Sequence, residues 1–309
     1  MGRPAYRFRG FIGHRAKVEP IVREVRGAKA RGIPASHIIV IGPSGVGKSL
    51  LVRELAAEYG TDVVKFIGVV TVKELLDALA KMKAGDFLLL DEAHALPADV
   101  QEVLYQLMDS GRILVTGQPE PFQAPAVTVV LSTDKPGALQ NALHKRIGTE
   151  VHLELYDDRS MKEIVEEVAD REDLLLSPQA AAHLAAVANG LPRRAEQLLH
   201  KLRLYYPDAE QGQMSVGQVT DFLGDFGIDG WGFGARERSY LRFLKREGTA
   251  SVATLANVLG VDPAFIERQV EPKLRRHGFV QIGAGGRSLT KTGRVWAKQN
   301  VSKLEPKED

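Results

Sequence analysis

The chain has 309 residues, of which 44% are hydrophobic and 26% charged, and it contains no cysteine. Such a chain is long enough for two or three domains with hydrophobic cores, and the lack of cysteine excludes disulfides and thiolate metal sites. The net charge of +2 hides a segregation, because residues 1–37 and 235–309 are each basic whereas the part between them is acidic. No apolar run approaches the roughly 18 residues of a membrane span, and the start lacks a signal-peptide core, so we expect a cytoplasmic protein without a membrane partner.

Predicted strands and helices alternate through the first 157 residues. Strands are expected at 38–41, 63–67, 87–92, 127–133 and 151–156, and helices at 48–59, 72–82 and 97–110. Thr71 and Glu74 form a capping box before the second helix, while Pro97 and Gly111 mark the start and the end of the third. Because buried-type strands that alternate with helices are typical of a covered parallel sheet, we expect an α/β fold here.

The rest of the chain is predicted to be mostly helical. Capping signals at Ser160, Ser177 and Pro192 open three helices within a small domain over residues 158–226. The glycine-rich stretch GDFGIDGWGFG (224–234) is the expected linker to the last domain. The last domain is expected to contain helices at 236–247, 251–259 and 263–276, a hairpin at 279–290, and a disordered tail at 299–309.

The stretch GPSGVGKS (42–49) joins the first strand to the first helix and matches the pattern G-x-x-x-x-G-K-[ST]. Glycines let successive backbone N–H groups turn inward toward phosphate oxygens, and the following helix adds its positive end. Lys48 can reach the outer phosphates, and Ser49 can offer a hydroxyl to Mg²⁺. The residues expected to bind ATP are Gly42, Pro43, Ser44, Gly45, Val46, Gly47, Lys48, Ser49 and Leu50.

Two carboxylates end the buried strand that reads LLLDE, where ATP hydrolysis needs them. Asp91 is expected to hold Mg²⁺ together with Ser49, and Glu92 to polarise the attacking water. Thr133 ends the next strand and is placed to sense the γ-phosphate. His94 invites comparison with DEAH helicases, but their other motifs are missing from the sequence, so we expect a surface or packing histidine.

Longer stretches give the chain a family resemblance along nearly its whole length. It resembles the RuvB family, the hexameric AAA+ motors of Holliday junction branch migration. The matching stretches are FIGHRAKVEPI (11–21), GPSGVGKS (42–49), LLLDEAHALPADVQEVLYQLMD (88–109), ALHKRIG (142–148), LELY (153–156), GLPRRAEQLLHKLRLY (190–205), GIDGWGFGARERSYL (227–241) and VEPKLRRHGFVQ (270–281). Phosphate loops occur in many families, but the last three stretches in this order are much more specific.

The resemblance implies both a fold and a set of nucleotide contacts. An AAA+ P-loop core is implied for residues 1–157, a helical lid for 158–226 and a winged helix for 235–298, with ATP and Mg²⁺ as cofactors. Arg146 is implied to be the finger that one subunit inserts into its neighbour's ATP site, and Arg193 to be the second sensor, which contacts the γ-phosphate from the lid. Further contacts near the adenine are implied for Phe11, Ile12, Tyr156 and Pro192.

The winged helix is implied to bind duplex DNA, and its charge favours the same partner. Residues 235–309 hold fifteen basic and eight acidic side chains, a surplus that can neutralise several phosphates. The expected DNA contacts are Arg275, Arg276, Arg287 at the wing tip, Lys291 and Arg294. We therefore predict an ATP-driven ring motor that acts on duplex or branched DNA.

Two other functions stay open on the sequence alone. One is an ATP-dependent DNA-binding switch or loader, of the origin-binding or transposition-regulating type, which would lack processive motion. The other is a remodeller of protein partners, which would leave the basic wing unused. The finger, the two sensors and the catalytic glutamate favour the motor over both.

Three features depart from the family pattern. His144 stands where the family usually has arginine, and the wing sequence QIGAGGR lacks basic residues that the family usually carries. The segment between Gly111 and Val127 is also shorter than in RuvB.

The short segment bears on a partner. Residues 113–116 and 127–130 can still pair, but three prolines among the ten residues between them disfavour an extended apolar tip. In the family this tip meets RuvA, the junction-binding partner. We therefore expect loading that does not depend on a RuvA of the usual kind, either alone or through another protein that contacts Phe122 or residues 1–37.

Overall fold

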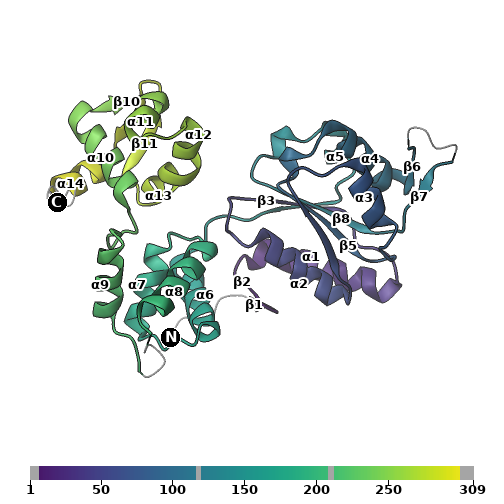
Figure 1. Cartoon of the computed structure of the whole chain (residues 1–309), viewed down its shortest axis with the longest axis horizontal. Coiled ribbons are helices and arrows are strands. Elements are labelled where there is room, and N and C mark those ends of the chain that lie inside the picture. Colours follow the sequence, from purple (N-terminus) through teal and green to yellow (C-terminus); the bar gives the residue numbers. More distant parts are fainter. Residues whose placement is uncertain (1–6, 116–119, 208–211, 300–309) are drawn as a thin grey trace. The chain divides into compact units, whose positions relative to one another are not determined.

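The computed structural model describes residues 7–115, 120–207 and 212–299, which fall into two compact units (Figure 1). The first unit contains the chain up to Ile164 together with Gly190–Arg193, and the second contains Val165–Asn189 and the chain from Arg194 onward. None of the helices in the described ranges combines the length and the apolar character that a membrane span requires.

The first unit alternates strands and helices, as the sequence predicts. In chain order its elements are β1 (Arg7–Phe8), β2 (Phe11–Ile12), α1 (Arg15–Arg31), β3 (Ile38–Ile41), α2 (Lys48–Tyr59), β4 (Val63–Ile67), α3 (Val72–Leu79), β5 (Phe87–Asp91), α4 (Ala98–Ser110), β6 (Arg112–Ile113), β7 (Phe122–Gln123), β8 (Thr128–Thr133), α5 (Asn141–His144), β9 (Thr149–His152) and α6 (Asp158–Arg171), whose C-terminal part belongs to the second unit.

Five parallel strands form the central sheet, in the order β4-β5-β8-β3-β9. Leu88 and Leu90 pack with α3 and α4 in one apolar cluster, whereas Phe87, on the opposite face, lies against Tyr59 of α2. Figure 1 shows α1 and α2 on one side of this sheet and α3 and α4 on the other. The predicted α/β fold is confirmed.

Parallel pairing brings several strand ends to the same edge of the sheet. Ile41 of β3 lies beside Thr133 of β8, and Asp91 of β5 lies beside Ser132. Ligands of parallel sheets bind at the carboxyl ends of the strands. The strand register therefore brings these residues together at the edge of the sheet where a ligand would bind.

The helix α1 is absent from the predicted elements. It buries an apolar stripe that includes Val18, Ile21, Val22 and Val25, and it packs against α2. The spacing of this stripe is the usual signal for a helix, but Pro20 interrupts the pattern in the second turn.

The predicted pairing of the short hairpin is wrong. Ile113 pairs with Phe122 in β7, not with residues 127–130. The strand Thr128–Thr133 is buried along its whole length in the centre of the sheet, so it is not free to form a hairpin. The expected tip at residues 116–119 lies outside the described residues.

The second unit joins lid helices to a winged helix. In chain order its elements after α6 are α7 (Pro178–Val187), α8 (Pro192–Tyr205), α9 (Val216–Asp225), α10 (Ala235–Glu247), β10 (Thr249–Ala250), α11 (Val252–Leu259), α12 (Pro263–Phe265), a π-helical turn (Ile266–Val270), α13 (Glu271–Arg276), β11 (Val280–Gly283), β12 (Gly286–Leu289) and α14 (Lys291–Gln299). The predicted hairpin is β11 and β12, and β10 pairs with β12.

The glycine-rich stretch before α10, which the sequence predicts to be a linker, contains packed residues. Phe233 is fully buried, and the ring of Trp231 lies edge-on to His277, with 5.1 Å between the ring centroids. Gly232 has a left-handed backbone (φ 75°), and a Cβ atom there would lie 2.3 Å from the carbonyl oxygen of Val187. Glycine serves close packing at this position, so the lid and the winged helix are joined by a fixed contact.

Candidate nucleotide site

The phosphate loop has a backbone that only glycine allows at three of its positions. Gly45 (φ 89°) and Gly47 (φ 95°) are left-handed, and a Cβ atom on Gly42 would lie 2.3 Å from the carbonyl oxygen of Leu153. The loop runs from the end of β3 into α2, and Val46 is buried within it. The predicted strand, loop and helix are all present, and they leave a concave backbone at the positive end of α2.

Lys48 is held inside this loop. Its side chain is almost fully buried, and Nζ donates hydrogen bonds to the carbonyl oxygens of Gly42 (2.8 Å) and Pro43 (3.1 Å). Burial lowers the pKa of Lys48, while the nearby carboxylates of Glu92 and Asp91 oppose that shift. The ammonium group of Lys48 thus has few polar partners among the described residues. It lies where phosphate oxygens can replace the two carbonyl oxygens as hydrogen-bond acceptors.

Asp91 lies at the centre of a polar cluster beside the loop. Its Oδ2 accepts a hydrogen bond from Ser49 Oγ (2.7 Å) and lies 2.7 Å from Lys65 Nζ, and its Oδ1 accepts from Ser132. Burial raises the pKa of Asp91, but the hydrogen bonds from Lys65, Ser132 and Ser49 outweigh burial and lower it to about 2. An ionised carboxylate and a hydroxyl at this separation could hold a divalent cation.

Sequence reasoning missed Lys65. Its Nζ also lies 3.3 Å from Ser49 Oγ, so it contacts both residues predicted to bind the metal. The sequence did contain a signal for this role, because Lys65 lies within a predicted strand. In the structure that strand pairs with the strand that ends in Asp91. The order of the strands, which the sequence does not give, was needed to use that signal.

The side chain of His94 contacts both Glu92 and Thr133, the residues predicted to polarise water and to sense the γ-phosphate. His94 Nδ1 is 3.2 Å from Thr133 Oγ1 and 3.5 Å from Glu92 Oε2. The sequence predicted a surface or packing residue here, and the structure places the His94 side chain, 19% exposed, against these two residues. It sits at the carboxyl edge of the sheet because a 3-10 turn at Ala93–Ala95 follows β5 directly.

Aromatic side chains flank the other side of the loop. Phe11, Ile12 and Tyr156 are buried, and a Cβ atom on Gly47 would lie 3.4 Å from the ring of Phe11 and 3.7 Å from the Tyr156 hydroxyl. The ring of His14, which the sequence did not single out, packs edge-on against Tyr156 with 4.4 Å between centroids. These residues form an apolar wall next to the phosphate loop.

Arg193 also reaches the loop. Its Nη1 donates to Ser44 Oγ (3.0 Å), and its backbone N–H donates to the carbonyl oxygen of Gly45 (3.2 Å). Pro192 begins α8 directly before it. The structure thus brings a guanidinium to the loop at which the phosphates are expected.

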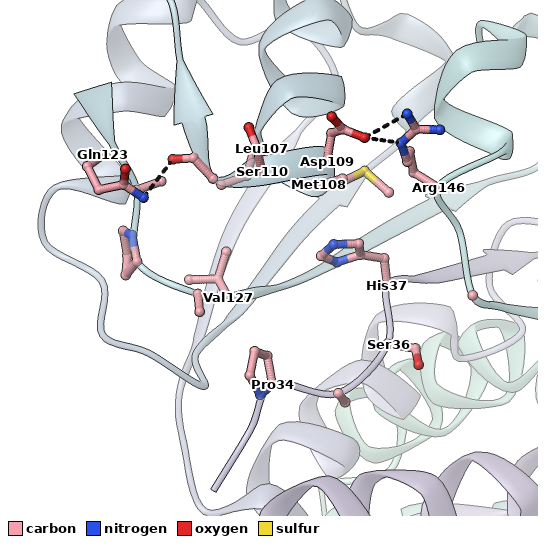
Figure 2. Close-up of a pocket in the computed structure, with 16 residues that line it drawn as sticks. Pro34, Ser36, His37, Leu107, Met108, Asp109, Ser110, Gln123, Val127 and Arg146 are labelled. Carbon is pink, nitrogen blue, oxygen red and sulfur yellow. Dashed lines mark hydrogen bonds and ion pairs between the residues drawn. The ribbon is translucent and has the colours of Figure 1, made fainter. Parts of the chain in front are cut away.

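Arg146 lies elsewhere, beside a pocket of about 520 Å³ at the amino ends of the strands (Figure 2). Its guanidinium pairs with Asp109 (2.6 Å), donates to the Tyr105 hydroxyl (3.1 Å) and stacks on the Tyr105 ring. His37, which precedes β3, and Val127, which precedes β8, line the same pocket. Arg146 is therefore on the opposite edge of the sheet from the phosphate loop of its own chain.

The predicted DNA contacts differ in their exposure. Arg275, Lys291 and Arg294 are exposed, and Arg276 is partly exposed. Arg287 does not lie at the wing tip: it is part of β12 and is only 13% exposed, because it forms ion pairs with Glu271 (2.9 Å) and Glu267 (2.8 Å). Its guanidinium holds two acidic side chains of its own domain.

Comparisons with known proteins agree over most of the chain. A family model described as the Holliday junction DNA helicase RuvB P-loop domain matches residues 3–153, and one described as the RuvB C-terminal winged helix domain matches residues 230–297. The Holliday junction branch migration complex subunit RuvB of Oenococcus oeni is 31% identical over 93% of this chain and 88% of its own length, and that of Synechococcus sp. (strain WH7803) is 31% identical over 93% and 82%. The structure of the Thermotoga maritima RuvB Holliday junction branch migration motor has a TM-score of 0.80 at 27% identity and covers 93% of this chain and 95% of that one.

Proposed function

The chain belongs to the RuvB family of Holliday junction branch migration ATPases, and from this premise we propose how its own residues drive the motor. It is an ATP hydrolase and an oligomeric DNA motor. We assign roles to individual residues because five side chains meet at one edge of the sheet, namely those of Lys48, Asp91, Glu92, Thr133 and Arg193. The alternative of an ATP-dependent switch or loader is not favoured by these relatives.

ATP is the nucleotide and Mg²⁺ the cation that we assign to the site. Backbone N–H groups of residues 42–50 cradle the phosphates, and Lys48 turns from the two carbonyl oxygens to the outer phosphates. Ser49 and Asp91 would hold Mg²⁺, since their oxygens are 2.7 Å apart and the cation Lys65 already occupies the adjoining space. When bound, Mg²⁺ neutralises charge on the phosphates.

Glu92 is the base that we assign to hydrolysis. It orients the attacking water and accepts its proton, while Thr133 and Arg193 contact the γ-phosphate. Phe11, Ile12, Tyr156 and Pro192 enclose the adenine.

Arg146 acts on the ATP of a neighbouring subunit. It lies at the amino ends of the strands, so its guanidinium cannot serve the phosphate loop at their carboxyl ends in the same chain. Because this arginine acts on the ATP of another subunit, hydrolysis requires that subunits assemble. We propose that they form a hexameric ring. Asp109 and Tyr105 hold the side chain in place in the single subunit.

The chain is organised in three parts, an ATPase core (1–157), a helical lid (158–226) and a winged helix (235–298), with the tail 299–309 beyond them. Arg275, Arg276, Lys291 and Arg294 bind phosphates of duplex or branched DNA. Arg287 supports the wing from within instead of contacting DNA directly. A chromosomal DNA substrate supports a location in the cytoplasm.

We also propose that loading does not require a RuvA of the usual kind. The described part of the hairpin consists of two two-residue strands, β6 and β7, and Leu114 is its exposed apolar residue. The names of the relatives call them subunits of a complex, which favours the opposite outcome. Titration with the RuvA of the same organism decides between the two: micromolar or tighter binding that disappears when residues 117–126 are replaced by a glycine-serine turn would refute the proposal.

A synthetic four-way junction tests the function as a whole. Purified protein with ATP and Mg²⁺ should convert the junction into its duplex products, alone or with an added loader, and the Glu92→Gln protein should not. A protein that binds the junction and hydrolyses ATP but never moves it would be a switch or loader instead.

A further inference from the structure

His94 contacts both the proposed sensor and the proposed base, and neither assignment explains it. It lies in the 3-10 turn Ala93–Ala95, which forms because Glu92 adopts a left-handed backbone (φ 56°, ψ 43°). A residue other than glycine in this conformation costs about 1–3 kcal/mol, so the surrounding structure must enforce the turn. The turn carries the His94 side chain to the end of β8, where Nδ1 meets the Thr133 hydroxyl.

The atoms around the imidazole decide which nitrogen carries the proton. Nδ1 faces three oxygens: Thr133 Oγ1 at 3.2 Å, and Glu92 Oε2 and Asp134 Oδ1 at 3.5 Å each. Nε2 faces Lys135 Nζ at 3.5 Å. A carboxylate can only accept a hydrogen bond and an ammonium can only donate one, so the neutral ring carries its hydrogen on Nδ1 and offers its lone pair at Nε2.

This tautomer leaves the Thr133 hydroxyl with a single role. Its oxygen accepts from Nδ1–H of His94 and from the backbone N–H of Lys135 (2.9 Å). A hydroxyl has two lone pairs and one hydrogen, so both acceptor positions are filled and the O–H is left to donate. The carbonyl oxygen of Thr133 accepts from the N–H of Gly42 (3.1 Å), which places this donor beside the start of the phosphate loop.

We propose that His94 is a positioning residue that turns the Thr133 hydroxyl proton toward the γ-phosphate of ATP. Its second contact, with Glu92, ties this sensor to the carboxylate that acts on water. The inference rests on the proposed function, because it assumes ATP in this site. It requires that His94 matters for binding of ATP and not for binding of ADP, since ADP lacks the phosphate that Thr133 contacts.

Three substitutions separate this role from a merely structural one. The amide nitrogen of asparagine takes the place of Nδ1, that of glutamine reaches the place of Nε2, and alanine supplies neither. Each is made in the Glu92→Gln protein, so that ATP stays intact, and the affinities for ATP and ADP are measured by calorimetric titration with Mg²⁺ present. His94→Ala and His94→Gln should weaken ATP binding about tenfold, leave ADP binding within roughly twofold, and His94→Asn should restore the affinity for ATP.

Two controls complete the experiment. His200→Ala removes an exposed histidine of the lid and should leave both affinities unchanged. In a Thr133→Val background His94→Ala should have no further effect, because the hydroxyl that it orients is gone. Three outcomes would each overturn the inference. The three His94 proteins could bind ATP with equal affinity, or the affinities for ATP and ADP could fall by the same factor. The third is a His94→Ala substitution that still weakens ATP binding by the full factor in the Thr133→Val background. Failure of the Glu92→Gln protein itself to bind ATP would overturn the proposed function and the inference together.

Discussion

Replacing Lys65 with methionine removes the ammonium group from the proposed metal site while keeping a side chain that extends to Cε. Lys65 Nζ lies 2.7 Å from Asp91 Oδ2 and 3.3 Å from Ser49 Oγ, so a divalent cation held by these two residues must displace it. We expect the Lys65→Met protein to bind the cation more tightly than the wild type and, without a cation, to be less stable.

The size of both effects follows from Asp91. Burial raises its pKa, but the three hydrogen bonds lower it from an ordinary 3.8 to about 2. This difference corresponds to about 2 kcal/mol of stabilisation, shared among three donors, so losing Lys65 should cost about 1 kcal/mol. Because the pKa of the folded state is depressed, this stabilisation is present at neutral pH and is lost as the pH falls from about 4 toward 2.

Two measurements check the prediction. Chemical unfolding at pH 7 in a chelator gives the loss of stability, and the electron paramagnetic resonance of free Mn²⁺ in the presence of ADP gives the affinity for the cation, which should rise about fivefold for a gain of about 1 kcal/mol. Lys81→Met, at an exposed position after α3, is the matched control. Weaker or unchanged Mn²⁺ binding by Lys65→Met would show that Lys65 supports the metal site instead of competing with it.

Three further predictions test the other assignments. Lys48→Ala should weaken nucleotide binding, whereas Glu92→Gln should keep ATP bound and nearly abolish phosphate release; near-normal hydrolysis by Glu92→Gln would identify another base. Arg146→Ala should bind ATP as an isolated subunit but not hydrolyse it, and mixing it with Glu92→Gln protein should return part of the activity; no recovery despite demonstrated co-assembly would refute a role in trans. Arg287→Ala should lower the free energy of unfolding by about 3 kcal/mol, because the buried carboxylate of Glu271 loses its ion pair and keeps the hydrogen bond from the Tyr240 hydroxyl, without changing how DNA affinity depends on salt. Arg275→Ala should instead reduce that salt slope by about one; the reverse ranking would place Arg287 on the DNA.

Local sequence was enough to predict five strands and the phosphate loop of the core, but not the helix α1. The five parallel strands, the loop and the helix that begins at Lys48 each carry their own signal, in apolar runs, glycines and caps. Glu92 and Thr133 could be placed together for the same reason, because each ends a buried strand and parallel strands end at one edge. The loop composition also fixed the glycine conformations, since Gly45 and Gly47 need a left-handed backbone.

Side chains whose role depends on a distant partner could not be predicted. Lys65 and His94 became part of the site through the order of the strands and a strained turn. Arg287 was expected to contact DNA because the family resemblance put it at the wing tip, whereas the carboxylates that neutralise it come from another part of the domain. The predicted pairing of residues 113–116 with 127–130 was wrong because Thr128–Thr133 pairs with two neighbouring strands of the central sheet. Local β-propensity does not reveal that competition between partners.

The sheet supplies a geometric reason for the role in trans that we propose for Arg146. Parallel strands send every residue that follows them to one edge, and the phosphate loop, Asp91 and Thr133 all lie there. Arg146 precedes β9 and lies at the other edge, separated by the length of a strand such as β8, whose six residues span about 20 Å at 3.3 Å per residue. No rotamer of an arginine side chain crosses that distance, so its guanidinium can meet a γ-phosphate only when the amino edge of one subunit faces the carboxyl edge of the next. Repeating this head-to-tail contact generates a closed ring if the rotation closes, and it makes hydrolysis a property of the assembly.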